Sequence, residues 1–121
     1  MIPVDPLIEG YLALSPRSYP LVSDIQLRLE RPEDAPPRAR LRIVLVPREQ
    51  SSHGLTLQFE GVQRLRLAQP DWSEFSIAHL SITSMIDRGM EGVGYQVRDE
   101  EEDSIEFLCH TFQYDIGPVE V

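Results

Sequence analysis

The stretch from Ile105 to Ile116 constrains the fold most, because its apolar residues alternate with other residues in two opposite phases. Two sets of three residues carry the pattern: Ile105, Phe107 and Cys109, then Phe112, Tyr114 and Ile116. Such alternation predicts a β-strand. The change of phase predicts either one extra residue, a β-bulge near Cys109 to Thr111, or a central strand that is buried on both faces. Both alternatives place this strand in the middle of the fold.

Period-two alternation in other parts of the chain predicts further strands. They are expected at residues 7–14 (an edge strand), 23–30, 38–46, 55–67, 76–86 (where a short helix is the alternative) and 95–99. The run 55–67 keeps one phase over a length that exceeds a usual strand. Because Gly61 lies in its middle, we expect two segments that meet at a corner, as in a barrel or in a sandwich whose strand changes sheet.

These elements together predict an all-β fold. About eight short strands, separated by turn residues and accompanied by at most one short helix, are typical of a mostly antiparallel sandwich or a partly open barrel. Sequential strands tend to be neighbours, so a meander is the most economical topology. The length of 121 residues fits a single β domain over residues 1–121.

The composition predicts a cytoplasmic protein. The N-terminus lacks the basic and apolar regions of a secretory signal, and no apolar run has the length of a membrane helix. The single cysteine, Cys109, cannot form an intramolecular disulfide, which agrees with a reducing compartment.

The net charge of −9 is concentrated in the second half of the chain. Residues 61–121 hold 12 acids and 4 arginines, whereas residues 1–60 hold 8 acids and 7 arginines. This balance argues against binding to nucleic acid or to anionic membranes, because both need an excess of cations. It favours association with a basic protein partner.

The acidic run between the last two predicted strands is the first candidate for that association. It consists of Asp99, Glu100, Glu101, Glu102 and Asp103. Its spacing differs from that of a calcium-binding loop. Consecutive like charges are also typical of a plain solvated turn, and that alternative stays open.

The basic residues concentrate on one predicted strand, where Arg38, Arg40 and Arg42 alternate with apolar residues. This spacing places the three guanidinium groups on one sheet face. They are a candidate site for a small anion or an acidic protein patch. The alternative is cross-strand pairing with Glu30 and Glu60 on a solvated face.

No complete catalytic or metal-binding set is present in the sequence. Cys109 and His110 are consecutive in a strand and therefore point to opposite faces, with Cys109 expected in the core. The three histidines, His53, His79 and His110, lack the spacing of a zinc site. Phosphate-loop, nucleophile-elbow and zincin motifs are missing. We therefore predict no catalytic residues, no metal site and no cofactor.

Three segments carry a resemblance to a known class of proteins. They are Leu57–Leu65, Tyr95–Asp99 and Ile105–Cys109. Their order resembles that of small acidic β-rich bacterial proteins, which include uncharacterised families and some immunity proteins of polymorphic toxin systems. The resemblance implies a cytoplasmic protein that binds a toxin domain and has no catalysis of its own.

The hypothesis that follows is a non-catalytic interaction protein, of the immunity type, that binds a basic partner. The alternative is a small-ligand-binding β-barrel or an enzyme whose site lies in the barrel mouth, with the histidines and arginines as first candidates. Homo-oligomerisation through an exposed edge strand, or through the face of Val44 and Val46, also stays open.

Overall fold

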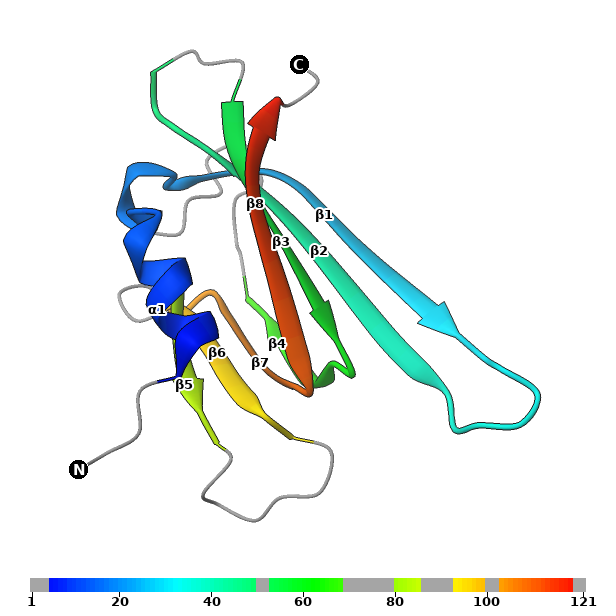
Figure 1. The fold of residues 1–121 in the computed structure, drawn as a ribbon. Coiled ribbons are helices and arrows are strands. Elements are labelled where there is room, and N and C mark those ends of the chain that lie inside the picture. The colour runs from blue at the N-terminus through cyan, green and yellow to red at the C-terminus, as the bar shows by residue number, and fades with distance from the viewer. Residues whose placement is uncertain (1–4, 50–52, 69–79, 86–92, 100–102, 119–121) are drawn as a thin grey trace.

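The protein folds into two antiparallel sheets and one short helix, as Figure 1 shows. The computed structural model describes residues 5–49, 53–68, 80–85, 93–99 and 103–118. The helix is α1 (Pro6–Ala13), and a single 3-10 turn, η1 (Pro16–Ser18), follows it. The strands are β1 (Leu21–Glu30), β2 (Arg38–Val46), β3 (His53–Glu60), β4 (Gln63–Leu67), β5 (Leu80–Ser84), β6 (Tyr95–Asp99), β7 (Ile105–Cys109) and β8 (Thr111–Pro118). The predicted all-β sandwich with at most one short α-helix is confirmed.

The first sheet has the strand order β1-β2-β3-β8, and all its pairs are antiparallel. Because alternate side chains point to opposite faces, each strand supplies an inner apolar row and a mainly polar outer row. In β2 the outer row also holds Val44, which is buried, so Val44 does not offer the exposed face that we considered for oligomerisation. Leu41, Ile43 and Leu45 of β2 are buried, whereas Arg38, Arg40 and Arg42 are exposed on the outer face. The strands predicted at 23–30 and 38–46 are therefore confirmed.

The second sheet has the order β4-β7-β6-β5 and is also antiparallel. Three consecutive strands form a meander, β5-β6-β7, and β4 lies beside β7, which is the strand order of a Greek key. The simple meander expected for the whole chain is therefore wrong. The strand predicted at 95–99 is confirmed, and that at 76–86 is confirmed for β5. Residues 76–79 and 86 lie outside the described residues.

Two corners carry the chain from one sheet to the other. The first corner joins β3 to β4 at Gly61, which has a φ of 68°. A Cβ at Gly61 would lie 2.8 Å from the Cβ of His110, so the second corner, at His110, passes directly beside it. The backbone N–H of His110 donates to the carbonyl of Glu60 across the two corners (2.8 Å). The corner predicted in the run 55–67 is confirmed.

The corner at His110 also explains the change of phase between Cys109 and Phe112. β7 belongs to the second sheet and β8 to the first, so both residues face the space between the sheets, and both are buried. The structure contains neither of the two predicted arrangements, a bulge within one strand or one strand buried on both faces. The chain changes sheet instead, and the residue at the corner, His110, is left exposed.

The core lies between the sheets and is rich in aromatic side chains. Phe59 and Phe107 come from opposite sheets and meet edge to face, with ring centroids 4.8 Å apart. Tyr95 and Phe112 form a second edge-to-face pair at 4.9 Å. Such pairs add about 0.5–1.5 kcal/mol to the burial of the rings.

The helix α1 replaces the edge strand that the sequence predicts at 7–14, and this prediction was wrong. The carboxylate of Asp5 caps the helix by accepting from the backbone N–H of Leu7 (2.9 Å) and Ile8 (3.4 Å). Pro6 occupies the first helical turn, where its missing N–H costs nothing. The helix then buries Tyr11 completely, between β5 and β8.

The opposite side of the sandwich has no such cover. β1 and β2 extend as an arm beyond the second sheet, as Figure 1 shows. Leu27 and Leu29 belong to the inner row of β1, opposite Leu41 and Ala39 of β2, but they are 51% and 62% exposed. The arm therefore combines an unpaired strand edge with two exposed leucines.

Candidate binding surfaces

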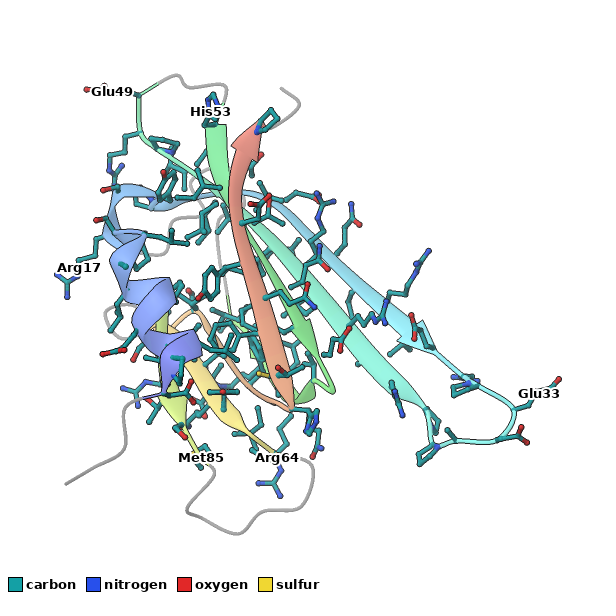
Figure 2. All side chains as sticks on the ribbon, in the orientation of Figure 1. Arg17, Glu33, Glu49, His53, Arg64 and Met85 are labelled. Carbon is teal, nitrogen blue, oxygen red and sulfur yellow. The ribbon has the colours of Figure 1, made fainter. Side chains whose placement is uncertain are left out.

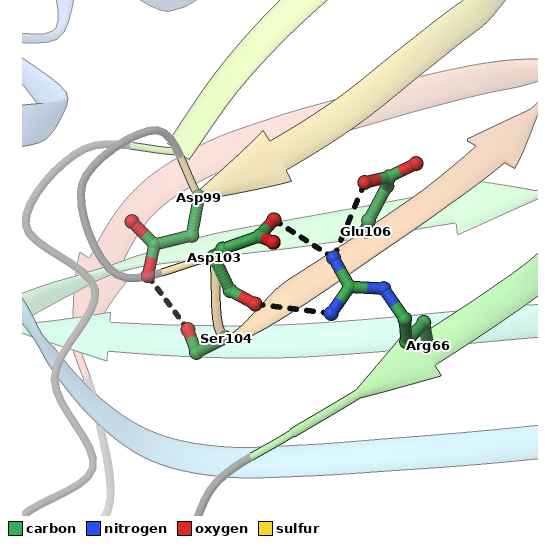
Figure 3. Close-up of polar contacts among 5 residues, drawn as sticks. All are labelled: Arg66, Asp99, Asp103, Ser104 and Glu106. Atoms are coloured by element: carbon green, nitrogen blue, oxygen red, sulfur yellow. Dashed lines mark hydrogen bonds and ion pairs between the residues drawn. The ribbon is translucent and has the colours of Figure 1, made fainter.

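The acidic turn between β6 and β7 is held at both of its ends. Asp99 is fully buried, and the hydroxyl of Ser104 donates to its carboxylate (2.6 Å), as Figure 3 shows. The backbone N–H of Asp103 donates to the carbonyl of Asp99 (3.2 Å). The central residues, Glu100 to Glu102, lie outside the described residues. Hydrogen bonds within the chain therefore fix both ends of the acidic turn.

Burial changes the part that Asp99 can play. We predicted it as a partner-binding residue together with Glu100, Glu101, Glu102 and Asp103, but a fully buried carboxylate offers no surface to a partner. Its inward direction follows from strand parity, because Asp99 continues the phase of the buried Tyr95 and Val97. That signal is present in the sequence. The prediction for the other four residues stays a prediction.

Asp103 is exposed and belongs to an ion-pair cluster on the second sheet. The guanidinium of Arg66, on β4, contacts the carboxylate of Asp103 (2.7 Å) and that of Glu106 on β7 (3.3 Å), and it also donates to the carbonyl of Asp103 (3.3 Å). These hydrogen bonds, with Asp103 first and Glu106 second, raise the pKa of Arg66. The cluster attaches the end of the acidic turn to the neighbouring strand.

The outer face of the first sheet carries the predicted arginine row. Arg40 lies between Glu30 of β1 (3.4 Å) and Glu60 of β3 (3.3 Å). This is the cross-strand pairing that we gave as the alternative to an anion site, and it is confirmed for Arg40. Arg38 and Arg42 are exposed, and within the described ranges neither forms an ion pair.

Three hollows of the described structure adjoin these arginines. One, of about 420 Å³, lies where the arm meets the two corners, and Arg38, Arg40, Glu60 and His110 are among its lining residues. The other two, of about 250 Å³ and about 610 Å³, lie on the outer face, and both include Arg42. Arg38 and Arg42 line different hollows, and an anion site on the three arginines stays a prediction.

The histidines do not form a common site, as far as the described residues show. His53 begins β3, pairs with Pro118 and lies at the far end of that strand in Figure 2, whereas His110 lies at the corner beside Glu60. Seven strand steps of about 3.3 Å separate the two ends. His79 lies outside the described residues. Within the described part of the chain, no group of three histidine, cysteine or acidic side chains could hold a metal ion.

Cys109 has the environment of a core residue. Its side chain is fully buried, and burial raises the pKa of the thiol from its ordinary value of 9.0 to about 12. A thiol with such a pKa is protonated at neutral pH, and so it is a poor nucleophile. The prediction that Cys109 is a small core residue is confirmed.

The comparison with protein families decides the class of this protein. The family model of immunity protein PIM8 matches residues 6–115, which span α1, both sheets and most of β8. The chain belongs to the PIM8 immunity protein family. Neither a search of curated proteins nor a search of solved structures gave a match. The resemblance to immunity proteins of polymorphic toxin systems is therefore confirmed.

The range matched by the PIM8 family model, residues 6–115, contains the surfaces described above. It includes the arm, the arginine row and the acidic turn. Within the described residues, no helix is long and apolar enough to cross a membrane. Among the described residues, the ends of the acidic turn, the arginine row and the open arm are candidate surfaces for a partner.

Proposed function

We propose that this PIM8 protein is a non-catalytic binding protein that neutralises a toxin by forming a complex with it. The observation that carries the proposal is the family match, which extends over almost the whole chain, residues 6–115. It acts as a single bacterial domain in the cytoplasm, where the free thiol of Cys109 stays reduced.

The partner of this complex is a basic protein surface, and the acidic turn is the contact site. The second half of the chain has 12 acids against 4 arginines. Asp103 is exposed at one end of the turn, and Asp99 and Ser104 anchor its base. A fixed base lowers the entropy that the segment loses on binding, which favours an interface residue over a freely moving one.

Charge reversal at the turn tests this contact. We take as the candidate toxin a protein encoded by a gene next to the gene for this chain. Its association with this chain is measured by surface plasmon resonance at several salt concentrations. The double substitution Glu101→Lys with Glu102→Lys should lower the association rate about tenfold or more at low salt and reduce its salt dependence.

The matched control reverses two adjacent acids elsewhere. Glu33 and Asp34 are exposed at the tip of the arm, so Glu33→Lys with Asp34→Lys changes the net charge by the same amount. This variant should change the association rate less than about threefold. It alters the net charge, and so the long-range attraction of the toxin, but it leaves the proposed contact residues unchanged. Equal effects of the two double variants would contradict a contact at the acidic turn.

A second function, anion binding by Arg38, Arg40 and Arg42, is favoured by one observation. Arg38 and Arg42 have no ion pair within the described ranges, and each lines a hollow. Inorganic phosphate should then shift the NMR signals of Arg38 and Arg42 side chains at millimolar concentration. Arg42→Ala should abolish the shift around β2, whereas Arg17→Ala, an exposed arginine beside α1, should not. A response that is spread evenly over all arginines would contradict this site.

A further inference from the structure

The strand β1 is a free edge of the first sheet. Among the described residues it pairs with β2 on one side only, and no described strand pairs with its other side. Natural proteins protect such edges, because they are templates for pairing with another strand. β1 carries charged side chains of this protective kind, yet it also exposes Leu27 and Leu29 beside the edge. This combination is typical of a strand that pairs with a further chain.

A bulge limits the length of edge that can pair regularly. The register between β1 and β2 shifts between Val22 and Asp24, so Ser23 is an extra residue. The regular edge therefore runs from Asp24 to Glu30. Its outer row carries Asp24, Gln26, Arg28 and Glu30, and its inner row carries Ile25, Leu27 and Leu29.

Arg28 has no acidic partner within its own described chain. It lies directly opposite Arg40 of β2, a like charge. The carboxylates nearest in the sheet, Glu30 and Glu60, already contact Arg40. A carboxylate on the free side of β1 would offset this repulsion.

We propose that β1 pairs antiparallel with β1 of a second copy of this chain, about a two-fold axis at Gln26. In this register Asp24 lies opposite Arg28 of the second copy, and the symmetric pair forms on the other side of the axis. Ile25 lies opposite Leu27 of the second copy, so each Leu27 gains an apolar neighbour across the new edge, whereas Leu29 lies opposite Ser23 at the bulge. The two first sheets become one continuous sheet of eight strands, four from each copy.

Charge complementarity selects this register over its neighbours. An axis at Leu27 would place Asp24 opposite Glu30 of the second copy, and the like charges would repel. An axis at Arg28 would place the two Arg28 side chains opposite each other. An axis at Leu29 would bring Pro32 opposite Gln26, and proline has no N–H to donate. Among these four, only the Gln26 register gives two opposite-charge pairs, within a regular ladder that runs from Asp24 to Arg28.

The inference does not rest on toxin binding, and its experiment needs only the purified full chain. Sedimentation equilibrium measures the molecular mass from dilute solution up to about 1 mM, because a contact of this size is expected to be weak. We expect a concentration-dependent dimer for the unchanged chain. Asp24→Arg and Arg28→Asp should each raise the dissociation constant about tenfold or more.

Two complementary combinations should restore the dimer. The double variant Asp24→Arg with Arg28→Asp exchanges the two charges and should dimerise like the unchanged chain. A mixture of the two single variants should form a mixed dimer, because each supplies the charges that the other lacks. Asp34→Arg, on the arm tip, is the matched control and should leave the dimer unchanged. Circular dichroism shows that each variant is folded.

Several results would overturn the proposal. A monomer at every concentration would do so, and so would a dimer that is insensitive to Asp24→Arg and Arg28→Asp. Failure of both restoring combinations in folded variants would exclude the Gln26 register. If the unchanged chain is monomeric and Asp24→Arg weakens binding of the candidate toxin, the edge belongs to a toxin strand and not to a second copy.

Discussion

The two open sides of the sandwich are finished in different ways. On the side of β5 and β8, the helix α1 covers the gap and inserts Tyr11, whose hydroxyl donates to the carbonyl of Leu80 (2.6 Å). On the other side, β1 and β2 extend past β4 without a cover, and Leu27 and Leu29 remain exposed. The first side uses apolar and polar contacts for stability. The second leaves two leucines more than half exposed, and we propose that they contact another molecule.

The largest effect should follow from emptying the covered side. Tyr11→Ala removes a fully buried ring and should lower the free energy of unfolding by about 3–5 kcal/mol. Leu12→Ala on the same helix is the control, because Leu12 is 53% exposed, and it should change stability by less than about 1 kcal/mol. Chemical denaturation measures both. Similar losses for the two variants would show that α1 does not close this side through Tyr11.

A smaller loss should follow from freeing the start of the helix. Asp5 caps α1 and also accepts a hydrogen bond from the hydroxyl of Tyr95 (2.9 Å). Asp5→Ala removes both contacts and should lower the free energy of unfolding, measured by chemical denaturation, by about 1–2 kcal/mol. Asp5→Asn can still cap the helix and should recover part of the loss. An Asp5→Ala chain as stable as the unchanged one would contradict the described helix cap.

The stability that the covered side contributes should fall at alkaline pH, because Tyr95 on that side titrates. The exposed leucines of the arm carry no titratable group. Burial, followed by the hydrogen bond and the charge of Asp5, raises the pKa of Tyr95 from 10.0 to about 12. Because the pKa of Tyr95 is higher in the folded than in the unfolded chain, the protonated hydroxyl stabilises the fold below pH 10. This stabilisation is lost as the pH rises from about 10 to 12. Tyr95→Phe should reduce the slope of stability against pH in this window by up to about 1.4 kcal/mol per pH unit. Equal slopes would contradict the described environment of Tyr95.

The smallest effect on folding should come from the open arm. Leu29→Ser replaces a side chain that is 62% exposed, so the free energy of unfolding should change by less than about 1 kcal/mol. Leu41→Ser, on the neighbouring strand, buries a hydroxyl in the core and should cost several times more. A large loss from Leu29→Ser, measured on the dilute monomer, would mean that the arm is covered within the chain itself.

Local patterns predicted much of the sheets, because side chains alternate with a period of two wherever one face is buried. The corner at Gly61 was also predictable, since the run around it was too long for one strand and contained a residue that tolerates a positive φ. The helix α1 was missed because its apolar residues also fit a short strand, although Asp5 followed by Pro6 is a helix-start signal.

The features that could not be predicted depend on contacts between distant segments. The alternation in β1 indicates a strand with one apolar row, but whether that row is covered depends on the width of the second sheet. In the same way, the separation of His53 from His110 follows from the pairing of β3 with β8. The acidic turn was visible as a charge run, and the inward direction of Asp99 was available from the parity of β6.

Neutralisation of a toxin is the central claim, and co-expression in bacteria tests it most directly. The candidate toxin encoded beside this chain is induced alone, with this chain, and with the Glu101→Lys, Glu102→Lys variant, and growth is recorded together with recovery of the complex. We predict that the unchanged chain restores growth and co-purifies with the toxin, and that the variant protects less. Continued growth arrest in cells that contain the folded chain, with no complex recovered, would contradict the account.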